Sequence, residues 1–92
     1  MELNREMMEL IGELAKLSKE ISYTEMYAES LRRTRAKLEE AGSTESTQRF
    51  SYRIHDEERK IRALTDKAMN RVHALAELYN AIPPTESKVV QP

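Results

Sequence analysis

Apolar residues recur at alternating steps of four and three along the first half of the chain. The series is Leu3, Met7, Leu10, Leu14, Leu17, Ile21, Thr24, Ala28, Leu31, Arg35 and Leu38. A heptad pattern of this kind is typical of a helix that packs one narrow stripe against a partner helix. Gly12 is the weakest residue inside it, since an interior glycine costs roughly 1 kcal/mol relative to alanine. The pattern predicts a helix over about 3–41.

A polar turn follows this predicted helix. Gly42 accepts the left-handed conformation of a helix C-cap, and the serine and threonine hydroxyls over 43–47 are good N-caps for another helix. We therefore expect a turn at about 42–46.

A second apolar series follows the turn. It consists of Phe50, Ile54, Ile61, Ala68, Val72, Leu75, Tyr79 and Ile82. Pro83 and Pro84 end the helical pattern, because proline lacks the backbone N–H and restricts the residue before it. The pattern predicts a helix over about 47–82. The polar tail over 83–92 is expected to be disordered.

The two predicted helices have similar lengths, about 55 Å each at a rise of 1.5 Å per residue, and the short turn between them requires an antiparallel return. A turn centred between Thr44 and Glu45 pairs residues whose numbers sum to about 89. The resulting pairs include Met7 with Ile82, Leu10 with Tyr79, Leu14 with Leu75 and Leu17 with Val72. The predicted fold class is therefore all-α, a long antiparallel helical hairpin over 1–82.

A further set of apolar residues lies outside this seam, mostly far from the turn. The set comprises Met8, Ile11, Ala15, Met69, Ala76 and Leu78, with Leu64 nearer the middle. An apolar stripe wider than one seam is typical of a helix with more than one neighbour, as in a four-helix bundle. These residues therefore predict an oligomer interface. A homodimer of hairpins is the favoured interpretation, and a complex with a different protein is the alternative.

A second cluster, Tyr23, Met26 and Tyr27, sits on mid-helix positions that the seam does not use. Tyrosine and methionine are enriched in protein interfaces, where they supply contact area and tolerate water at one edge. We treat this cluster as a candidate partner interface. The alternative is a set of scattered surface side chains, which are normal in soluble proteins.

The chain has little net charge, but its bases are unevenly distributed. The net charge is −1, but residues 31–62 carry nine bases against six acids, and most of the bases lie near the turn. The basic tip consists of Arg32, Arg33, Arg49 and Arg53. Arginine forks match carboxylates and phosphates, so a small nucleic-acid-binding regulator is one alternative function. The favoured interpretation is that these arginines form ion pairs with the acidic residues interleaved among them. The same acidic residues disfavour nucleic acid as a partner.

The chemistry of catalysis is missing from the sequence. The chain has no cysteine and two histidines. His73 has Glu77 four positions later, and His55 begins the run His55-Asp56-Glu57-Glu58, in which adjacent positions point in different directions and would give a metal few ligands. We interpret both as surface histidines with ion pairs at helical spacing. The hydroxyls around the turn have no base to activate them and are interpreted as helix caps. We predict no catalytic residues, no metal and no cofactor, and so a protein that is not an enzyme.

One family has a similar outline. The chain resembles the small Esx-type helical hairpins of type VII secretion, and Tyr52-Arg53-Ile54-His55-Asp56 matches their short Tyr-x-x-x-Asp export pattern. The resemblance implies a secreted or chaperoned four-helix dimer. The chain departs from the family because it has no Trp-x-Gly at the turn, and because its Tyr52–Asp56 match begins the second helix instead of following the hairpin.

The sequence as a whole favours a non-enzymatic interaction module, such as an adaptor, inhibitor or assembly factor, that acts as a hairpin oligomer with a protein partner. Small helical proteins of this kind are common in phage and mobile elements. The N-terminus has no apolar run of the signal-peptide type, and no stretch is apolar enough for a membrane span. We therefore expect a cytoplasmic protein without membrane contact.

Overall fold

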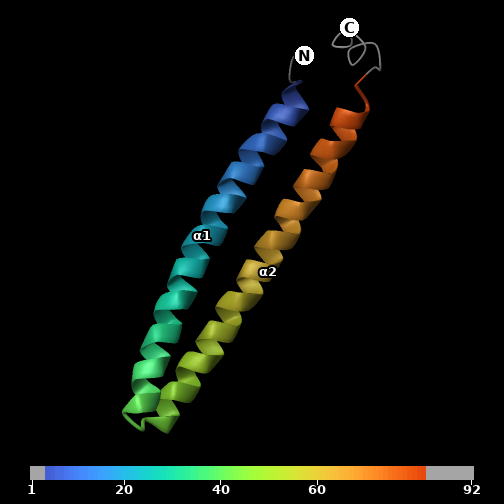
Figure 1. Ribbon diagram of the computed structural model, residues 1–92. Coiled ribbons are helices and arrows are strands. Elements are labelled where there is room, and N and C mark those ends of the chain that lie inside the picture. The colour runs from blue at the N-terminus through green and yellow to red at the C-terminus, as the bar shows by residue number, and fades with distance from the viewer. Residues whose placement is uncertain (1–3, 83–92) are drawn as a thin grey trace, which may run out of the picture.

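The computed structural model describes residues 4–82 and consists of two long helices (Figure 1). Helix α1 spans Arg5–Glu40 and helix α2 spans Thr44–Asn80. They run antiparallel and side by side, with the turn at one end of the rod and both ends of the hairpin at the other (Figure 1). No strand occurs within residues 4–82. The predicted all-α hairpin is confirmed, while the tail expected over 83–92 lies outside the described residues.

Local hydrogen bonds explain where α1 begins and ends. At its start, the Asn4 side chain accepts a 2.8 Å hydrogen bond from the Met7 backbone N–H, as an N-cap should. At its end, Gly42 takes a φ of +75°, and the N–H of Ser43 donates to the carbonyl of Leu38 at 3.0 Å. This is the Schellman arrangement, which glycine favours because it has no Cβ to clash in the left-handed region.

The turn is shorter than the sequence pattern predicts. Ser43 serves as the N-cap residue of α2, and its carbonyl accepts hydrogen bonds from both the N–H and the hydroxyl of Thr47. The hydroxyl residues that follow Ser43, from Thr44 onward, are therefore already helical. Only Ala41–Ser43 separates the two helices. The centre of the turn lies near Gly42, about two residues earlier than predicted.

This shift changes the predicted register between the helices. The hydrogen bonds and ion pairs across the hairpin join Tyr27 with Arg53, Glu13 with Arg71, Arg35 with Ser51, and Arg32 with Glu58. Their residue numbers sum to 80, 84, 86 and 90, which average 85 and not 89. Val72 and Tyr79, which the pattern placed in the seam, are 42% and 60% exposed. The seam near the open end instead uses Leu75 together with Arg71 and Leu78, which are half-buried.

The seam does not form an enclosed core. Four apolar residues are buried, namely Met7, Ala28, Leu31 and Ile54, and no large side chain in the described part of the chain is fully enclosed. The accessible surface is 7487 Å², whereas a compact protein of 10.7 kDa exposes roughly 5,500 Å². The radius of gyration is 20.9 Å, against about 12 Å for a compact domain of this length. The rod therefore leaves most of its apolar side chains in contact with water.

Replacing each of the two glycines by alanine should have opposite effects on the stability of the hairpin. A Cβ at Gly12 would meet nothing within 4 Å on an exposed helix interior, so Gly12→Ala should stabilise the hairpin by about 1 kcal/mol. Gly42→Ala should destabilise it by about 1 kcal/mol, because alanine is strained at a positive φ. Thermal unfolding followed by circular dichroism at one fixed concentration measures both. A Gly42→Ala protein as stable as the parent would contradict the left-handed cap.

Candidate interaction surface

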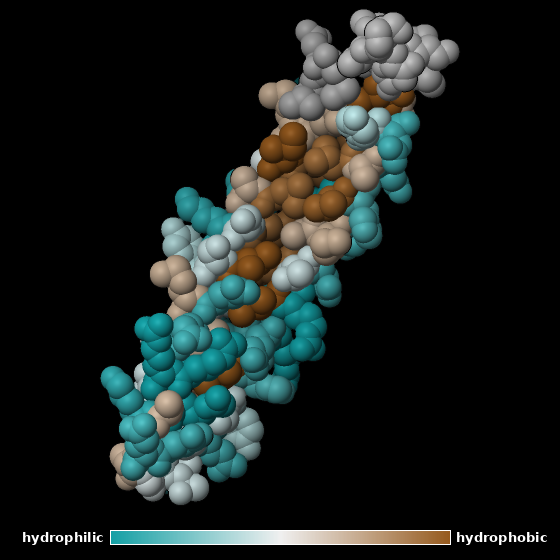
Figure 2. Space-filling view, viewed as in Figure 1, coloured by the Kyte–Doolittle hydropathy of each residue, from teal (hydrophilic) through white to brown (hydrophobic). Residues whose placement is uncertain are grey.

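A shallow groove between α1 and α2 lies near the open end of the rod. Its volume is about 410 Å³, and its lining is Met7, Ile11, Val72, Leu75, Ala76, Tyr79 and Asn80. None of these residues is charged. Figure 2 shows apolar side chains gathered over this half of the rod, between the two helices, with polar side chains dominating the half near the turn.

More apolar residues extend the groove on the same side of the rod. Met8 and Ala15 lie three positions before and four positions after Ile11, and side chains at these spacings are neighbours on a helix surface. On α2, Met69 lies three positions before Val72 and is likewise its neighbour on the helix surface. We name the resulting surface the open-end face. Its residues are Met8, Ile11, Ala15, Met69, Val72, Ala76 and Tyr79.

The structure places five of the six predicted oligomer residues on this face. They are Met8, Ile11, Ala15, Met69 and Ala76, and all five are exposed. The sixth, Leu78, is half-buried at a seam position between the helices. Sequence reasoning missed Val72 and Tyr79, because it had assigned both to the seam. The heptad spacing from Arg71 to Leu78 was the signal for the alternative register.

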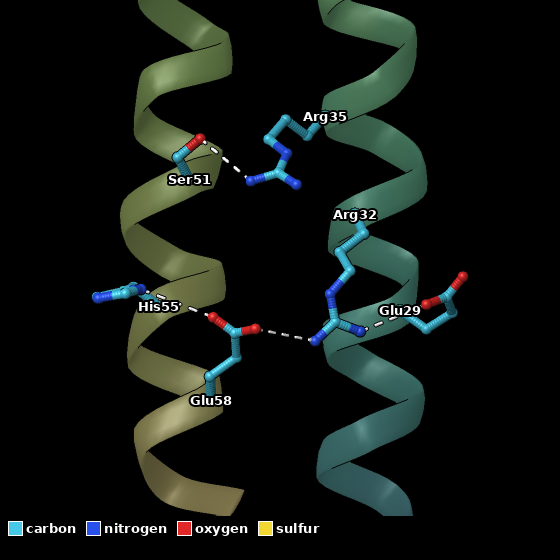
Figure 3. Close-up of polar contacts among 6 residues, drawn as sticks. All are labelled: Glu29, Arg32, Arg35, Ser51, His55 and Glu58. Atoms are coloured by element: carbon cyan, nitrogen blue, oxygen red, sulfur yellow. Dashed lines mark hydrogen bonds and ion pairs between the residues drawn. The ribbon is translucent and has the colours of Figure 1, made fainter.

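Ion pairs occupy the same side of the rod nearer the turn (Figure 3). Arg32 lies 3.4 Å from the carboxylate of Glu29 and 3.3 Å from that of Glu58 on the other helix. His55 is 3.6 Å from Glu58. Arg32 is three heptads beyond Ile11 on α1, so the two side chains point to the same side of the rod. This side therefore changes from apolar to ionic along its length.

The predicted basic tip carries its own counter-charges. Arg33 pairs with Glu29 at 3.5 Å and Arg49 with Glu45 at 2.9 Å, both along one helix turn. Arg53 donates to the Tyr27 hydroxyl and lies 5.6 Å from the centre of the Phe50 ring.

The antiparallel return also brings further acids into this half of the rod. Residues 23–62 carry nine bases and eight acids, because this half of the rod also includes Glu25 and Glu29 of α1, which lie beside Arg32. The predicted charge polarity along the rod is thus largely cancelled in the fold. Exposed pairs of this kind add little stability each, but they leave no strong positive field for phosphates.

Tyr23, Met26 and Tyr27 form a separate exposed cluster. Tyr27 lies across the seam from Arg53, and together with Asp56 and Lys60 they line a second, more polar hollow. Tyr27 and Arg32 flank the buried seam residues of α1, so Tyr27 points to the side opposite the ion pairs of Figure 3. The tyrosine cluster therefore belongs to a different surface from the open-end face.

Glu57 is the one charged residue within residues 4–82 that is buried in the seam. Glu57 is 8% exposed, and its carboxylate lies 2.8 Å from the ammonium group of Lys60. The hydrogen bond from Lys60 to Glu57, together with the negative charge of Glu57, raises the pKa of Lys60 above its ordinary value. A buried carboxylate among seam residues costs stability, but it disfavours registers that would bury it without a partner.

No group of three or more His, Asp or Glu side chains within residues 4–82 is arranged to hold a metal ion. Within the same range, neither helix is long and apolar enough to cross a membrane. Tyr52, the first residue of the Esx-like pattern, is exposed in the early turns of α2.

Comparisons with known proteins add no identification. No protein-family model, curated protein or solved structure matches the chain.

Replacing the buried carboxylate tests its role in the seam. Glu57→Leu should stabilise the hairpin by about 1–2 kcal/mol, because leucine of similar volume removes the cost of burying a charge. Glu77→Leu, an exposed position on the same helix, should change stability by less than about 0.5 kcal/mol. Thermal unfolding at matched concentration gives both values. A loss of stability in Glu57→Leu would show that the pair with Lys60 stabilises the fold on balance.

Proposed function

We propose that this chain is a non-enzymatic protein-interaction module that assembles with a second copy through the open-end face. The contact forms a four-helix bundle over that part of the rod and leaves the remainder free for a protein partner. One observation carries the proposal: of the nine large apolar side chains that are exposed among the described residues, five gather on one side at one end of the rod. They are Met8, Ile11, Met69, Val72 and Tyr79. Scattered apolar residues would need no such explanation.

The energetics of the hairpin support association. Ordering a residue costs roughly 1.5 kcal/mol, and an isolated two-helix seam buries too little apolar surface to offset that cost comfortably. Covering the open-end face would remove Ile11 and Val72 from water and give α1 and α2 a second packing partner. Association is the means by which such a rod acquires an enclosed core.

A second copy suits this face better than a charged partner does. The groove lining contains no charged side chain, so two identical faces meet without like-charge repulsion. The net charge of −1 likewise adds little long-range repulsion between copies. Homodimers with a two-fold axis are the commonest soluble oligomers, and in them both copies use the same surface for the contact.

A matched pair of substitutions on α2 tests the assignment. Ala76 lines the groove, whereas Ala63 is exposed three positions after Lys60, on the flank of α2 that faces away from the groove. Ala76→Glu should weaken the dimer at least tenfold, since it places a charge in an apolar contact, whereas Ala63→Glu should leave it unchanged. Sedimentation equilibrium measures the dissociation constant of each variant.

Two outcomes would contradict the proposal. A parent protein that stays monomeric and helical at every concentration would remove the homodimer. Equal dissociation constants for Ala76→Glu and Ala63→Glu would remove the open-end face as its interface. A parent that becomes a stable helix only when mixed with another protein would favour the heteromeric alternative over self-association.

A further inference from the structure

The side of the rod that carries the open-end face is apolar for only part of its length. Small uncharged residues follow the face, with Ser18 and Ser22 on α1 and Thr65 on α2. Beyond them the same side carries Glu25 and Arg62, and then the ion pairs of Figure 3. A second copy that covers the apolar part must therefore either cover the ionic part as well or point away from it.

We infer that the two copies pair open end to open end, with their turns pointing in opposite directions. This inference rests on the proposed dimer. Two flat rods that stack face to face about a two-fold axis have two arrangements. In one arrangement the rods are parallel, and each residue lies level with the same residue of the other copy. In the other the rods are antiparallel, and the axis crosses the centre of the open-end face.

The parallel arrangement would bring the ionic halves together. Arg32 already binds Glu29 and Glu58, so its charge is satisfied within one chain and gains nothing from a partner. The side chains of Arg32 and Glu58 are 37% and 44% exposed, and a second copy would strip water from them. Removing water from paired charges without new partners is unfavourable.

The antiparallel arrangement avoids that cost. With the axis near Ile11, the start of α1 at Arg5 reaches about as far as Ser18 of the other copy, and the overlap ends before Glu25. The overlap is about 20 Å long, and the rod is 24 Å across its second dimension. Both copies together bury roughly 1,000 Å², near the lower limit for a specific interface. The dimer is therefore reversible on dilution.

This geometry has a functional consequence for the tyrosine cluster. Tyr23 and Tyr27 lie beyond the overlap, so each dimer presents two copies of the cluster, one on each side of the central bundle. A partner with two binding sites would gain from this spacing, because the second contact becomes intramolecular. The open-end face holds the copies together, and the projecting halves stay accessible.

Distances between spin labels distinguish the two arrangements. The chain has no cysteine, so single substitutions Lys19→Cys and Ser30→Cys, both at exposed positions, carry one label each. In the antiparallel dimer, moving the label from 19 to 30 lengthens the distance between copies by about 30 Å, twice the rise over eleven residues. In the parallel dimer the distance changes by less than about 15 Å, even if the rods splay by 50°.

A second matched pair checks the same point without labels. Ala15 and Ala36 are exposed on α1 and occupy the same heptad position, three heptads apart. Ala15→Glu should weaken the antiparallel dimer at least tenfold, and Ala36→Glu should leave its dissociation constant unchanged. Equal weakening by both variants would overturn the antiparallel arrangement, as would a label distance that stays constant between 19 and 30. Labelled proteins that are monomeric like their unlabelled parent would instead overturn the dimer itself.

Discussion

A hairpin of two helices has one seam, and this constraint governs the rest of the structure. Each helix can turn only one narrow stripe toward the other, so only four apolar residues of the described chain are buried: Met7, Ala28, Leu31 and Ile54. The heptad pattern is sufficient to align the helices, but it does not enclose a core. Apolar residues beyond the stripe remain in water unless another molecule covers them. Their position along the rod therefore indicates where association is most favourable.

The turn decides which residues those are. The Schellman cap at Gly42 and the N-cap at Ser43 leave only three residues between α1 and α2, and this fixes the register. A turn two residues later would move Val72 and Tyr79 into the seam and leave the groove of the open-end face without two of its walls. Glu57 and its pair with Lys60 reinforce the same register from the middle of the rod. Local backbone chemistry thus shapes a surface more than 40 Å away along the helices.

The sequence predicts the two helices and the stripe of α1 well, because a leucine, isoleucine or methionine fills most of the heptad positions between Met7 and Leu38. It predicts the end of α2 poorly. Two alternative pairs of residues there have the same heptad spacing, Val72 with Tyr79 and Arg71 with Leu78. The first pair is more hydrophobic, so the sequence pattern favours it for the seam. The structure uses Arg71 because its aliphatic stem covers the seam while its guanidinium group reaches Glu13 on α1. Five of the six residues predicted for the oligomer surface still lie on the open-end face, since their distance from the seam depends little on the register.

The charges near the turn were misjudged for another reason: counting them along the chain overlooks the acids that the antiparallel return brings alongside.

The central claim is that folding of this hairpin is coupled to its association with a second copy. Thermal unfolding of the unmodified chain, followed by circular dichroism over two orders of magnitude in protein concentration, tests it most directly. Coupled folding predicts a Tm that rises steadily with concentration, because mass action stabilises only the associated state, and a mass twice 10.7 kDa at the upper end. A Tm that is independent of concentration, together with a monomeric mass throughout, would contradict the account.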